Sequence, residues 1–191
     1  MKQHARTLGQ VFLHDHNILK KIIQFSNLAQ GSNVIEIGCG KGALTQYLAQ
    51  KNHVSVIEID DRWIHYVMAL KLPNVHFIHH DALTVDYSQF SNGCPVVANI
   101  PYHITTPLII ALAQAQPQLG PITIMIQDDV AKRILSQPGT KSYGALSIFC
   151  AYHFNITNGF FVSRQCFQPI PNVDSYVLKP VSYTHLTLPT T

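Results

Sequence analysis

Short apolar runs rich in β-branched residues alternate along this chain with segments in which apolar residues recur at helical spacing. The runs predict five strands, at residues 33–37, 53–59, 75–79, 95–99 and 122–127. The helical segments predict helices at residues 43–50, 61–70, 105–116 and 128–136. Strands that alternate with helices favour a parallel sheet with helices on both faces. The expected fold class is therefore α/β.

Two later runs break this alternation. Residues 154–163 and 175–178 have the pattern of strands, and no long helix lies between them. Two such strands can form an antiparallel hairpin, with residues 164–174 as the connecting loop. We expect a mostly parallel sheet with this antiparallel hairpin at one edge.

Composition narrows the class of protein. The chain has 191 residues, enough for one domain of ordinary size, and 47% of them are hydrophobic, which excludes intrinsic disorder. The longest apolar runs, residues 96–98 and 107–113, are far shorter than the roughly 20 residues that a membrane span needs. We expect a globular protein with no membrane partner.

Cysteines and histidines favour a cytoplasmic protein without a metal site. The four cysteines form no C-x-x-C pair and are interpreted as reduced thiols, and residues 1–14 lack the pattern of a secretion signal. Of the eleven histidines, His79 and His80 are adjacent at the end of a predicted strand, so they should point to opposite faces. We expect no bound metal.

Charge is distributed unevenly along the chain. Residues 1–21 carry four basic residues and one acidic, residues 22–130 carry four basic and eight acidic, and residues 131–191 carry five basic and one acidic. Two basic ends would suit a polyanion, while the acidic middle would suit a cationic ligand. The alternative is scatter among few charges.

A glycine-rich turn follows the first predicted strand. Residues 36–42 read EIGCGKG, at the point where open α/β sheets bind ligands. Glycines let the backbone turn tightly and approach a ligand closely, although the turn can also be a plain connection between strand and helix. We take Gly38 and Gly40 as candidate cofactor-binding residues.

Carboxylates follow the next two predicted strands. Glu58 ends the second strand, where it could accept hydrogen bonds from both hydroxyls of a ribose, with Ile59 beside it. Asp81 and Ala82 follow the third strand, where the carboxylate could accept a hydrogen bond from an adenine amino group. Together with the glycine turn, these residues predict an adenosine site.

The predicted adenosine site fits S-adenosylmethionine better than a dinucleotide. The turn has the spacing G-x-G-x-G and lacks the G-x-G-x-x-G of dinucleotide folds. S-adenosylmethionine has no pyrophosphate to bind. Its sulfonium is a cation, and the negative charge of the acidic middle of the chain is complementary to it.

The fourth predicted strand is followed by Asn99, Ile100, Pro101 and Tyr102. The N6 amino group of adenine is a poor nucleophile unless it is held, and the Asn99 side-chain oxygen and the Ile100 carbonyl could each accept one of its hydrogens. Pro101 biases Ile100 toward an extended conformation. Tyr102 offers a flat face for an extruded base, worth about 1–3 kcal/mol. The alternative is a strand-ending turn with a core tyrosine.

A proline-containing loop, FQPIP at residues 167–171, lies between the last two predicted strands. Phe167 at its head could cover the second face of an extruded adenine. A phenylalanine taken alone is more often a core residue.

These motifs together resemble the ribosomal RNA adenine N6,N6-dimethyltransferase family. The similarity in order and spacing covers about residues 4–180, and the matching segments are residues 9–13, 36–42, 58–60, 81–82, 99–102 and 167–175. The resemblance implies a Rossmann-like class I fold that uses S-adenosylmethionine. It also implies cofactor contacts at Val11, Leu13, Gly38, Gly40, Glu58, Ile59, Asp81, Ala82 and Asn99.

The resemblance further implies dimethylation of two adjacent adenosines near the 3′ end of 16S ribosomal RNA, on the immature small subunit, by a monomer. Asp174 and Pro107 favour this branch, because resistance enzymes acting on large-subunit RNA usually carry Asn and Asp at these positions. The chain departs from the family at Val11 and His103, where Asn is common.

The expected domain organisation is a catalytic domain at residues 1–180 and a non-native tail at residues 181–191, without the helical C-terminal domain of the family. Competing functions are a nicotinamide-dependent oxidoreductase, a large-subunit adenine methyltransferase and a non-enzymatic ribosome-assembly factor. The first does not explain residues 99–102, and the last would be expected to lose Asn99 or Tyr102.

Overall fold

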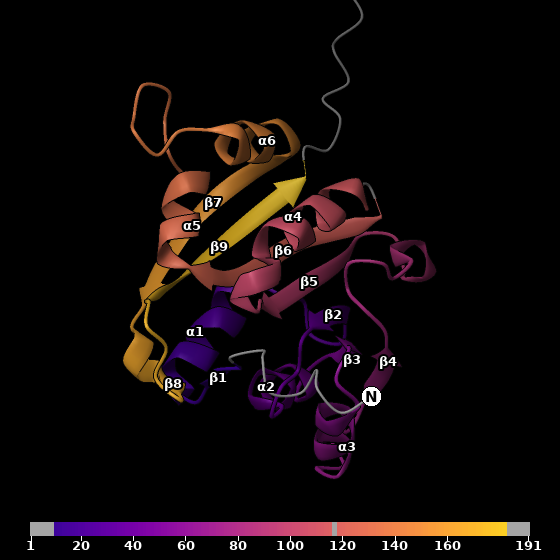
Figure 1. The fold of residues 1–191 in the computed structure, drawn as a ribbon. Coiled ribbons are helices and arrows are strands. Elements are labelled where there is room, and N and C mark those ends of the chain that lie inside the picture. The colour runs from indigo at the N-terminus through magenta and orange to yellow at the C-terminus, as the bar shows by residue number, and fades with distance from the viewer. Residues whose placement is uncertain (1–9, 116–117, 183–191) are drawn as a thin grey trace, which may run out of the picture.

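A computed structural model of the protein describes residues 10–115 and 118–182 (Figure 1). Its centre is a seven-stranded sheet with the order β4-β3-β2-β5-β6-β9-β7. The strands are β2 (Asn33–Ile37), β3 (His53–Glu58), β4 (Val75–His79), β5 (Cys94–Asn99), β6 (Leu119–Gln127), β7 (Phe154–Val162) and β9 (Ser175–Ser182).

Strands β4, β3, β2, β5 and β6 are parallel neighbours, whereas β9 runs antiparallel between β6 and β7. The α/β class, the parallel sheet and the antiparallel pair at one edge are confirmed. From β2 the chain builds outward to β3 and β4 and then returns to β5 on the other side. This reversal of strand order makes the carboxyl ends of β2 and β5 the expected ligand site.

Side chains alternate between two hydrophobic cores, one on each face of the sheet. In β2, for example, Ile35 and Ile37 belong to one core and Val34 to the other. One face is covered by α1 (His16–Ser26), α2 (Ala43–Ala49) and α3 (Asp61–Met68). The other is covered by α4 (Thr105–Gln114), α5 (Asp128–Ile134) and α6 (Ala145–His153) (Figure 1). None of the helices in residues 10–115 and 118–182 is long and apolar enough to cross a membrane.

Two strand boundaries differ from the prediction by more than one residue. Strand β6 begins at Leu119, because an irregularity opposite Cys94 and Val96 accommodates Gly120 and Pro121, which look like a turn in the sequence. Strand β9 continues through Pro180 to Ser182. Beyond Leu178 it pairs with β7 alone, so a proline is tolerated there. The first two residues of the expected tail therefore lie in the sheet, and residues 183–191 lie outside the described residues.

The N-terminal part contains elements that the sequence analysis does not predict. Strand β1 (Phe12–Leu13) pairs antiparallel with β8 (Phe167–Gln168), which lies inside the expected loop 164–174. Helix α1 begins after Asp15, whose side chain accepts hydrogen bonds from the N–H groups of Asn17 (2.8 Å) and Ile18 (3.0 Å). Elsewhere, the described residues contain three short 3₁₀ turns: η2 (Tyr87–Gln89), η3 (Tyr102–Ile104) and η4 (Arg164–Cys166).

Candidate cofactor and adenine site

The turn after β2 passes through the left-handed region at three glycines. φ is +76° at Gly38, +48° at Gly40 and +74° at Gly42, values that residues with a Cβ rarely adopt. A Cβ on Gly42 would lie 2.9 Å from the Val67 side chain, and one on Gly40 would lie 3.0 Å from the ring of Phe12. The backbone path itself therefore requires glycine at the carboxyl end of the central strand.

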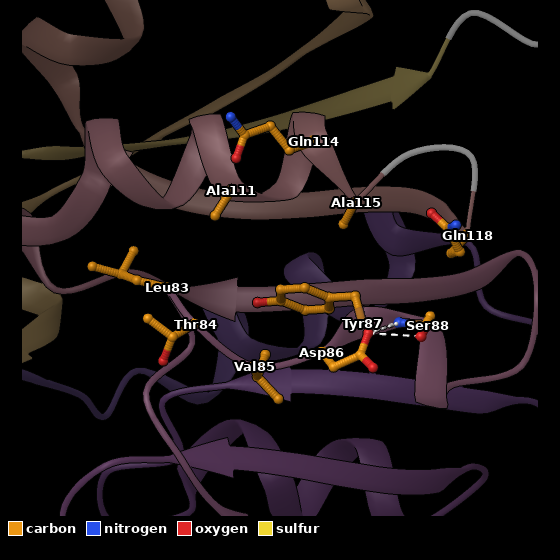
Figure 2. Close-up of a pocket in the computed structure, with 10 residues that line it drawn as sticks. All are labelled: Leu83, Thr84, Val85, Asp86, Tyr87, Ser88, Ala111, Gln114, Ala115 and Gln118. Atoms are coloured by element: carbon orange, nitrogen blue, oxygen red, sulfur yellow. Dashed lines mark hydrogen bonds between the residues drawn. The ribbon is translucent and has the colours of Figure 1, made fainter.

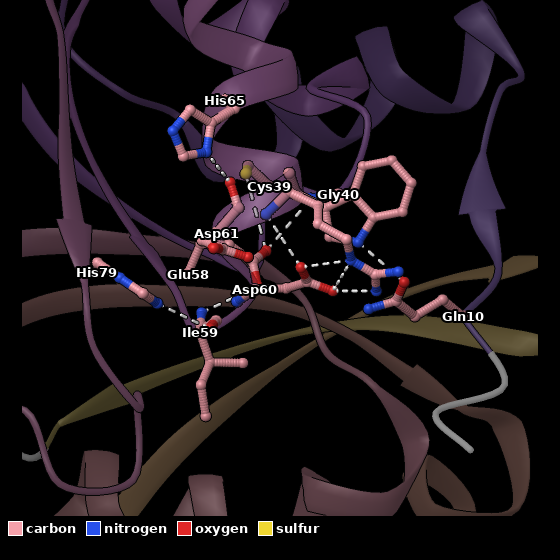
Figure 3. A network of polar contacts seen from close by, with 11 residues as sticks. Gln10, Cys39, Gly40, Glu58, Ile59, Asp60, Asp61, His65 and His79 are labelled. Atoms are coloured by element: carbon pink, nitrogen blue, oxygen red, sulfur yellow. Dashed lines mark hydrogen bonds and ion pairs between the residues drawn. The ribbon is translucent and has the colours of Figure 1, made fainter. Parts of the chain in front are cut away.

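Glu58 lies at the end of β3, next to this turn, and is 7% exposed. Its Oε1 accepts hydrogen bonds from the N–H groups of Ile59 (2.9 Å) and Asp60 (3.0 Å). Its Oε2 accepts a longer one from the Gly40 N–H (3.5 Å) and a weak one from the Cys39 thiol (3.7 Å) (Figure 3). These donors fix the carboxylate against the glycine turn.

Ile59 is 58% exposed directly after this carboxylate. Nε2 of His79, from the end of β4, lies 3.0 Å from the Ile59 carbonyl oxygen (Figure 3). An open apolar side chain beside a fixed carboxylate suits a nucleoside, which needs apolar contact for its base and an acceptor for its ribose hydroxyls.

The N-terminal segment is held over the glycine turn by contacts that no sequence pattern indicates. The Trp63 indole donates a hydrogen bond to Gln10 Oε1 (2.8 Å), and its ring meets Phe12 edge-on at 4.9 Å between centroids. The Lys41 ammonium lies 4.9 Å from the centre of the Phe12 ring. These contacts place β1 beside Gly40, although the two segments are far apart in the sequence.

Asp81 and Ala82 follow β4 and are partly committed to the protein itself. Asp81 Oδ1 accepts a hydrogen bond from the Leu83 N–H (2.9 Å), and the Ala82 carbonyl accepts one from the Tyr87 hydroxyl (2.9 Å). The Ala82 side chain is buried in the core. Ala82 can therefore offer a ligand its N–H, but neither its side chain nor a free carbonyl.

Val11 and Leu13 face inward. Leu13 is buried, and Val11 is half-buried against the same core. Any contact between Leu13 and a cofactor must therefore come from its backbone, in the strand that lies beside the glycine turn.

Asn99 ends β5, and its carbonyl oxygen lies 3.8 Å from where a Cβ on Gly38 would be, so the strand end abuts the glycine turn. The Ile100 N–H donates to the Met125 carbonyl (3.1 Å), which fixes the backbone. Among the hydrogen bonds between described residues, none engages the Asn99 side chain or the Ile100 carbonyl. These are the two acceptors that the sequence analysis assigns to the adenine amino group.

Tyr102 is half-buried and is fixed at its hydroxyl. The Tyr102 hydroxyl lies 3.0 Å from the Ser175 hydroxyl, and Ser175 is fully buried at the start of β9. Burial raises the pKa of Tyr102. Pro101 has φ −57° and ψ 130° and precedes the 3₁₀ turn η3, which carries the ring. The sequence analysis does not identify Ser175 as a site residue.

Phe167 requires a correction. It is 1% exposed, and its side chain packs in the core with Leu13, with which it pairs across β1 and β8. In this structure it has no free face on which a base could stack. The physical reason is the β1–β8 pairing, which turns the start of the loop inward. Phe167 is a core residue that supports the N-terminal segment.

Elsewhere, a cavity of about 320 Å³ lies between residues 83–88 and the end of α4 (Figure 2). It contains none of the expected site residues. A second cavity, of about 610 Å³, lies beside the glycine turn and is lined by residues of β1, α1 and α2 and by Lys41 of the turn. In residues 10–115 and 118–182, no group of three His, Cys, Asp or Glu side chains could hold a metal ion.

Comparison with known proteins identifies the family. The family model described as "Ribosomal RNA adenine dimethylase" matches residues 1–186. The chain belongs to this family. The match ends inside the expected tail 181–191, so the domain boundary at residue 180 stays a prediction.

Curated relatives within the ribosomal RNA adenine dimethylase family agree. A "Ribosomal RNA small subunit methyltransferase A" from Streptococcus agalactiae serotype V is 42% identical over 92% of this chain. A protein of the same name from Enterococcus faecalis is 38% identical over 94% of this chain. The chain spans 64% of the first relative and 65% of the second, just under two thirds of their length.

Solved structures also resemble this member of the family. A dimethyladenosine transferase from Plasmodium falciparum has a TM-score of 0.80 at 32% identity, covering 90% of this chain and 63% of that one. The 23S rRNA methyltransferase ErmE has a TM-score of 0.78 at 27% identity, covering 94% and 72%. The Rossmann-like methyltransferase fold is confirmed, and the cofactor of the family is S-adenosylmethionine.

Replacing Glu58 tests the cofactor site. Glu58→Gln should weaken S-adenosylmethionine binding about tenfold, because a charge-assisted hydrogen bond contributes about 1.5–3 kcal/mol and tenfold in affinity is about 1.4 kcal/mol. Glu58→Ala should weaken it further, because the N–H groups of Ile59 and Asp60 also lose their acceptor. Isothermal titration calorimetry measures both. Asp61→Asn, at the next exposed acid in the chain, is the matched control. Unchanged affinity for S-adenosylmethionine in a folded Glu58→Ala protein would refute the assignment.

Replacing Tyr102 separates the ring from its hydroxyl. Tyr102→Phe should keep methylation turnover near that of the unmodified protein but lower stability by about 1 kcal/mol, because buried Ser175 loses its partner. Tyr102→Ala should reduce turnover about tenfold or more through lost stacking. Steady-state kinetics and thermal denaturation distinguish the two effects. An equal loss of turnover in both variants would assign the role to the hydroxyl instead.

Proposed function

We propose that residues 1–180 form the catalytic domain of an enzyme that dimethylates N6 of two adjacent adenosines near the 3′ end of 16S ribosomal RNA. The observation that carries this proposal is the end of β5 beside the glycine turn, where no hydrogen bond between described residues engages the Asn99 side chain or the Ile100 carbonyl. The immature small subunit would be the substrate, and we expect a cytoplasmic monomer.

The cofactor would be held by the ends of β2, β3 and β4. Glu58 keeps a carboxylate at the glycine turn, and Ile59 offers an apolar face. No hydrogen bond between described residues engages the Ala82 N–H, so it could donate to a ligand. Gly38 and Gly40 leave the backbone open to close approach. Glu58 would thus bind the ribose, Ile59 and Ala82 would contact the adenine, and the glycine turn would make room for the methionine chain of S-adenosylmethionine.

Catalysis by this chain would consist of positioning and polarisation. When bound, S-adenosylmethionine supplies an electrophilic methyl group. Asn99 and Ile100 would accept the two N6 hydrogens, which orients the nitrogen lone pair and increases its electron density. Tyr102 would stack on the adenine, held in place by Ser175. No base is needed beforehand, because the N6 proton becomes acidic only as the new bond forms.

Several basic residues that could contact RNA are already paired. Arg164 pairs with Asp174 at 3.1 Å, and on α5 Lys132 and Arg133 pair with the acids four residues before them. On α1, the exposed Lys20 has no ion pair within the described residues, and Lys21 lies over the Phe160 ring at 4.1 Å. Contacts between such exposed basic side chains and RNA phosphates would make RNA binding depend on salt. In the described part of the chain, we expect these contacts to be centred on α1.

The large-subunit alternative has less support. The similarity to ErmE is 27% identity, against 42% to the small-subunit relative from Streptococcus agalactiae. A non-enzymatic role would leave Asn99 and Tyr102 without a function.

Mass spectrometry of ribosomal RNA tests the proposal. Small subunits lacking the modification are incubated with the protein and S-adenosylmethionine, and 16S and 23S fragments are searched for N6,N6-dimethyladenosine. We expect two adjacent modified adenosines near the 3′ end of 16S RNA. Modification of 23S RNA alone would support the alternative, and absence of methyl transfer to either RNA would contradict an enzymatic function for this chain.

A further inference from the structure

Glu36 is a buried acid to which the proposed function assigns no role. It lies in β2, two residues before the glycine turn, and is 1% exposed. Neither of its carboxyl oxygens has a hydrogen-bond partner in the described part of the chain. A buried carboxylate without partners is strongly disfavoured, so such a group needs an explanation.

The described groups that act on the charge of Glu36 are a hydroxyl and a second acid. Opposite lies Thr45 of α2, which is fully buried and whose hydroxyl also lacks a partner. On β3, Glu58 is two residues beyond Val56, the residue that pairs with Glu36, so both carboxyls occupy the same face of the sheet. Burial raises the pKa of the Cys39 thiol, and the nearby charges of Glu58 and Glu36 raise it further.

These neighbours determine the charge of Glu36. Burial and the negative charge of Glu58 raise the pKa of Glu36 from 4.5 to about 8. The hydroxyl and the backbone N–H of Thr45 oppose this shift because they lie near the carboxyl, although neither completes a hydrogen bond of good geometry with it. At neutral pH the free protein therefore holds Glu36 mainly in its protonated form. Introducing a positive charge nearby would reverse this preference.

We propose that Glu36 is a proton-linked counter-charge for the cofactor: it is protonated in the free protein and releases its proton to solvent when S-adenosylmethionine binds at the glycine turn. The O–H bond of the carboxyl breaks, the proton passes to the buffer, and the carboxylate that remains would balance the cofactor's positive charge. The proposal rests on the cofactor assignment above. It explains why an acid without a partner occupies the core directly beneath the turn.

Proton release can be counted by calorimetry. S-adenosylmethionine is titrated at pH 7.0 in phosphate, HEPES and Tris, whose ionisation enthalpies differ, so that the slope of observed enthalpy gives the number of protons exchanged. Glu36→Gln should release close to one proton fewer per bound ligand than the unmodified protein. Because both proteins bind the same ligand, protonation changes of the ligand itself cancel in this difference. Asp86→Asn, at an acid remote from the turn, should match the unmodified protein.

A second measurement does not depend on a variant. The affinity of the unmodified protein for S-adenosylmethionine should increase about tenfold per pH unit between pH 6 and 8 and level off above. S-adenosylhomocysteine, which keeps the ammonium but lacks the sulfonium charge, identifies the source. Equal proton release with both ligands assigns the effect to the ammonium, and smaller release assigns it to the sulfonium.

Two results would overturn the proposal. If the unmodified protein and Glu36→Gln bind with equal proton release, Glu36 is not the linked group, and the cofactor assignment still stands. If that variant does not fold, a pH-independent affinity of the unmodified protein leads to the same conclusion. Absence of S-adenosylmethionine binding by the folded protein would refute the cofactor assignment together with it.

Discussion

Asn99→Ala should reduce methylation turnover by about a hundredfold, the scale associated with losing the placement of a reacting group. The amide is free at the end of β5, so its removal leaves one N6 hydrogen without an acceptor while the Ile100 carbonyl stays in place. Single-turnover methylation of immature small subunits, at saturating RNA and S-adenosylmethionine, measures this step directly.

The matched control is Asn155→Ala, at an exposed asparagine on the edge strand β7. It should leave the single-turnover rate unchanged. If Asn99→Ala retained the rate and lost only RNA affinity, Asn99 would contribute to binding and the proposed role in orienting N6 would be wrong.

Glu36 should make the protein less stable as pH rises from 4.5 to about 8. Its pKa is raised in the folded state, so over this range the folded protein retains a proton that the unfolded chain releases. The free energy of unfolding should then decrease by up to about 1.4 kcal/mol per pH unit through this group, with no further contribution below or above the range. Urea denaturation of the unmodified protein and Glu36→Gln at pH 5, 6, 7 and 8 measures the difference in slope.

The comparison of slopes isolates Glu36, because the two proteins differ only at this titratable group. Asp86→Asn is the control, because hydrogen bonds from Ser88 lower the pKa of Asp86 and keep it ionised throughout. Parallel curves for the unmodified protein and Glu36→Gln would show that Glu36 is charged in the folded state.

The sequence predicts the parallel half of the sheet well because each strand there is a short apolar run bounded by polar residues. Strands β2 and β4 match their predicted ranges residue for residue. The sequence analysis does not predict helix α1, although its signal is present: Asp15 is a capping residue, and buried Leu19 and Ile22 recur at helical spacing. Helix α6 is apolar almost throughout, so it has little amphipathic pattern to detect.

Of the candidate site, the sequence could predict the residues that follow strand ends, because parallel strands bring their carboxyl ends to one edge. It could not predict which side chains turn inward. Phe167 and Leu13 are buried by a pairing of segments more than 150 residues apart, and the bond from Tyr102 to Ser175 spans 73 residues. Such contacts depend on the tertiary arrangement and leave no local periodicity.

The position of β9 has a consequence for the order in which the protein is completed. β9 is the last of the described strands, yet it lies between β6 and β7, so β7 is joined to the sheet only through residues 175–182. The same strand begins with Ser175, the anchor of Tyr102. The attachment of β7 to the sheet and the anchoring of the Tyr102 ring thus depend on the same segment. A nascent chain that stops before residue 175 would contain every strand-end residue of the site, but its Tyr102 ring would lack the anchor that holds it for stacking on the base.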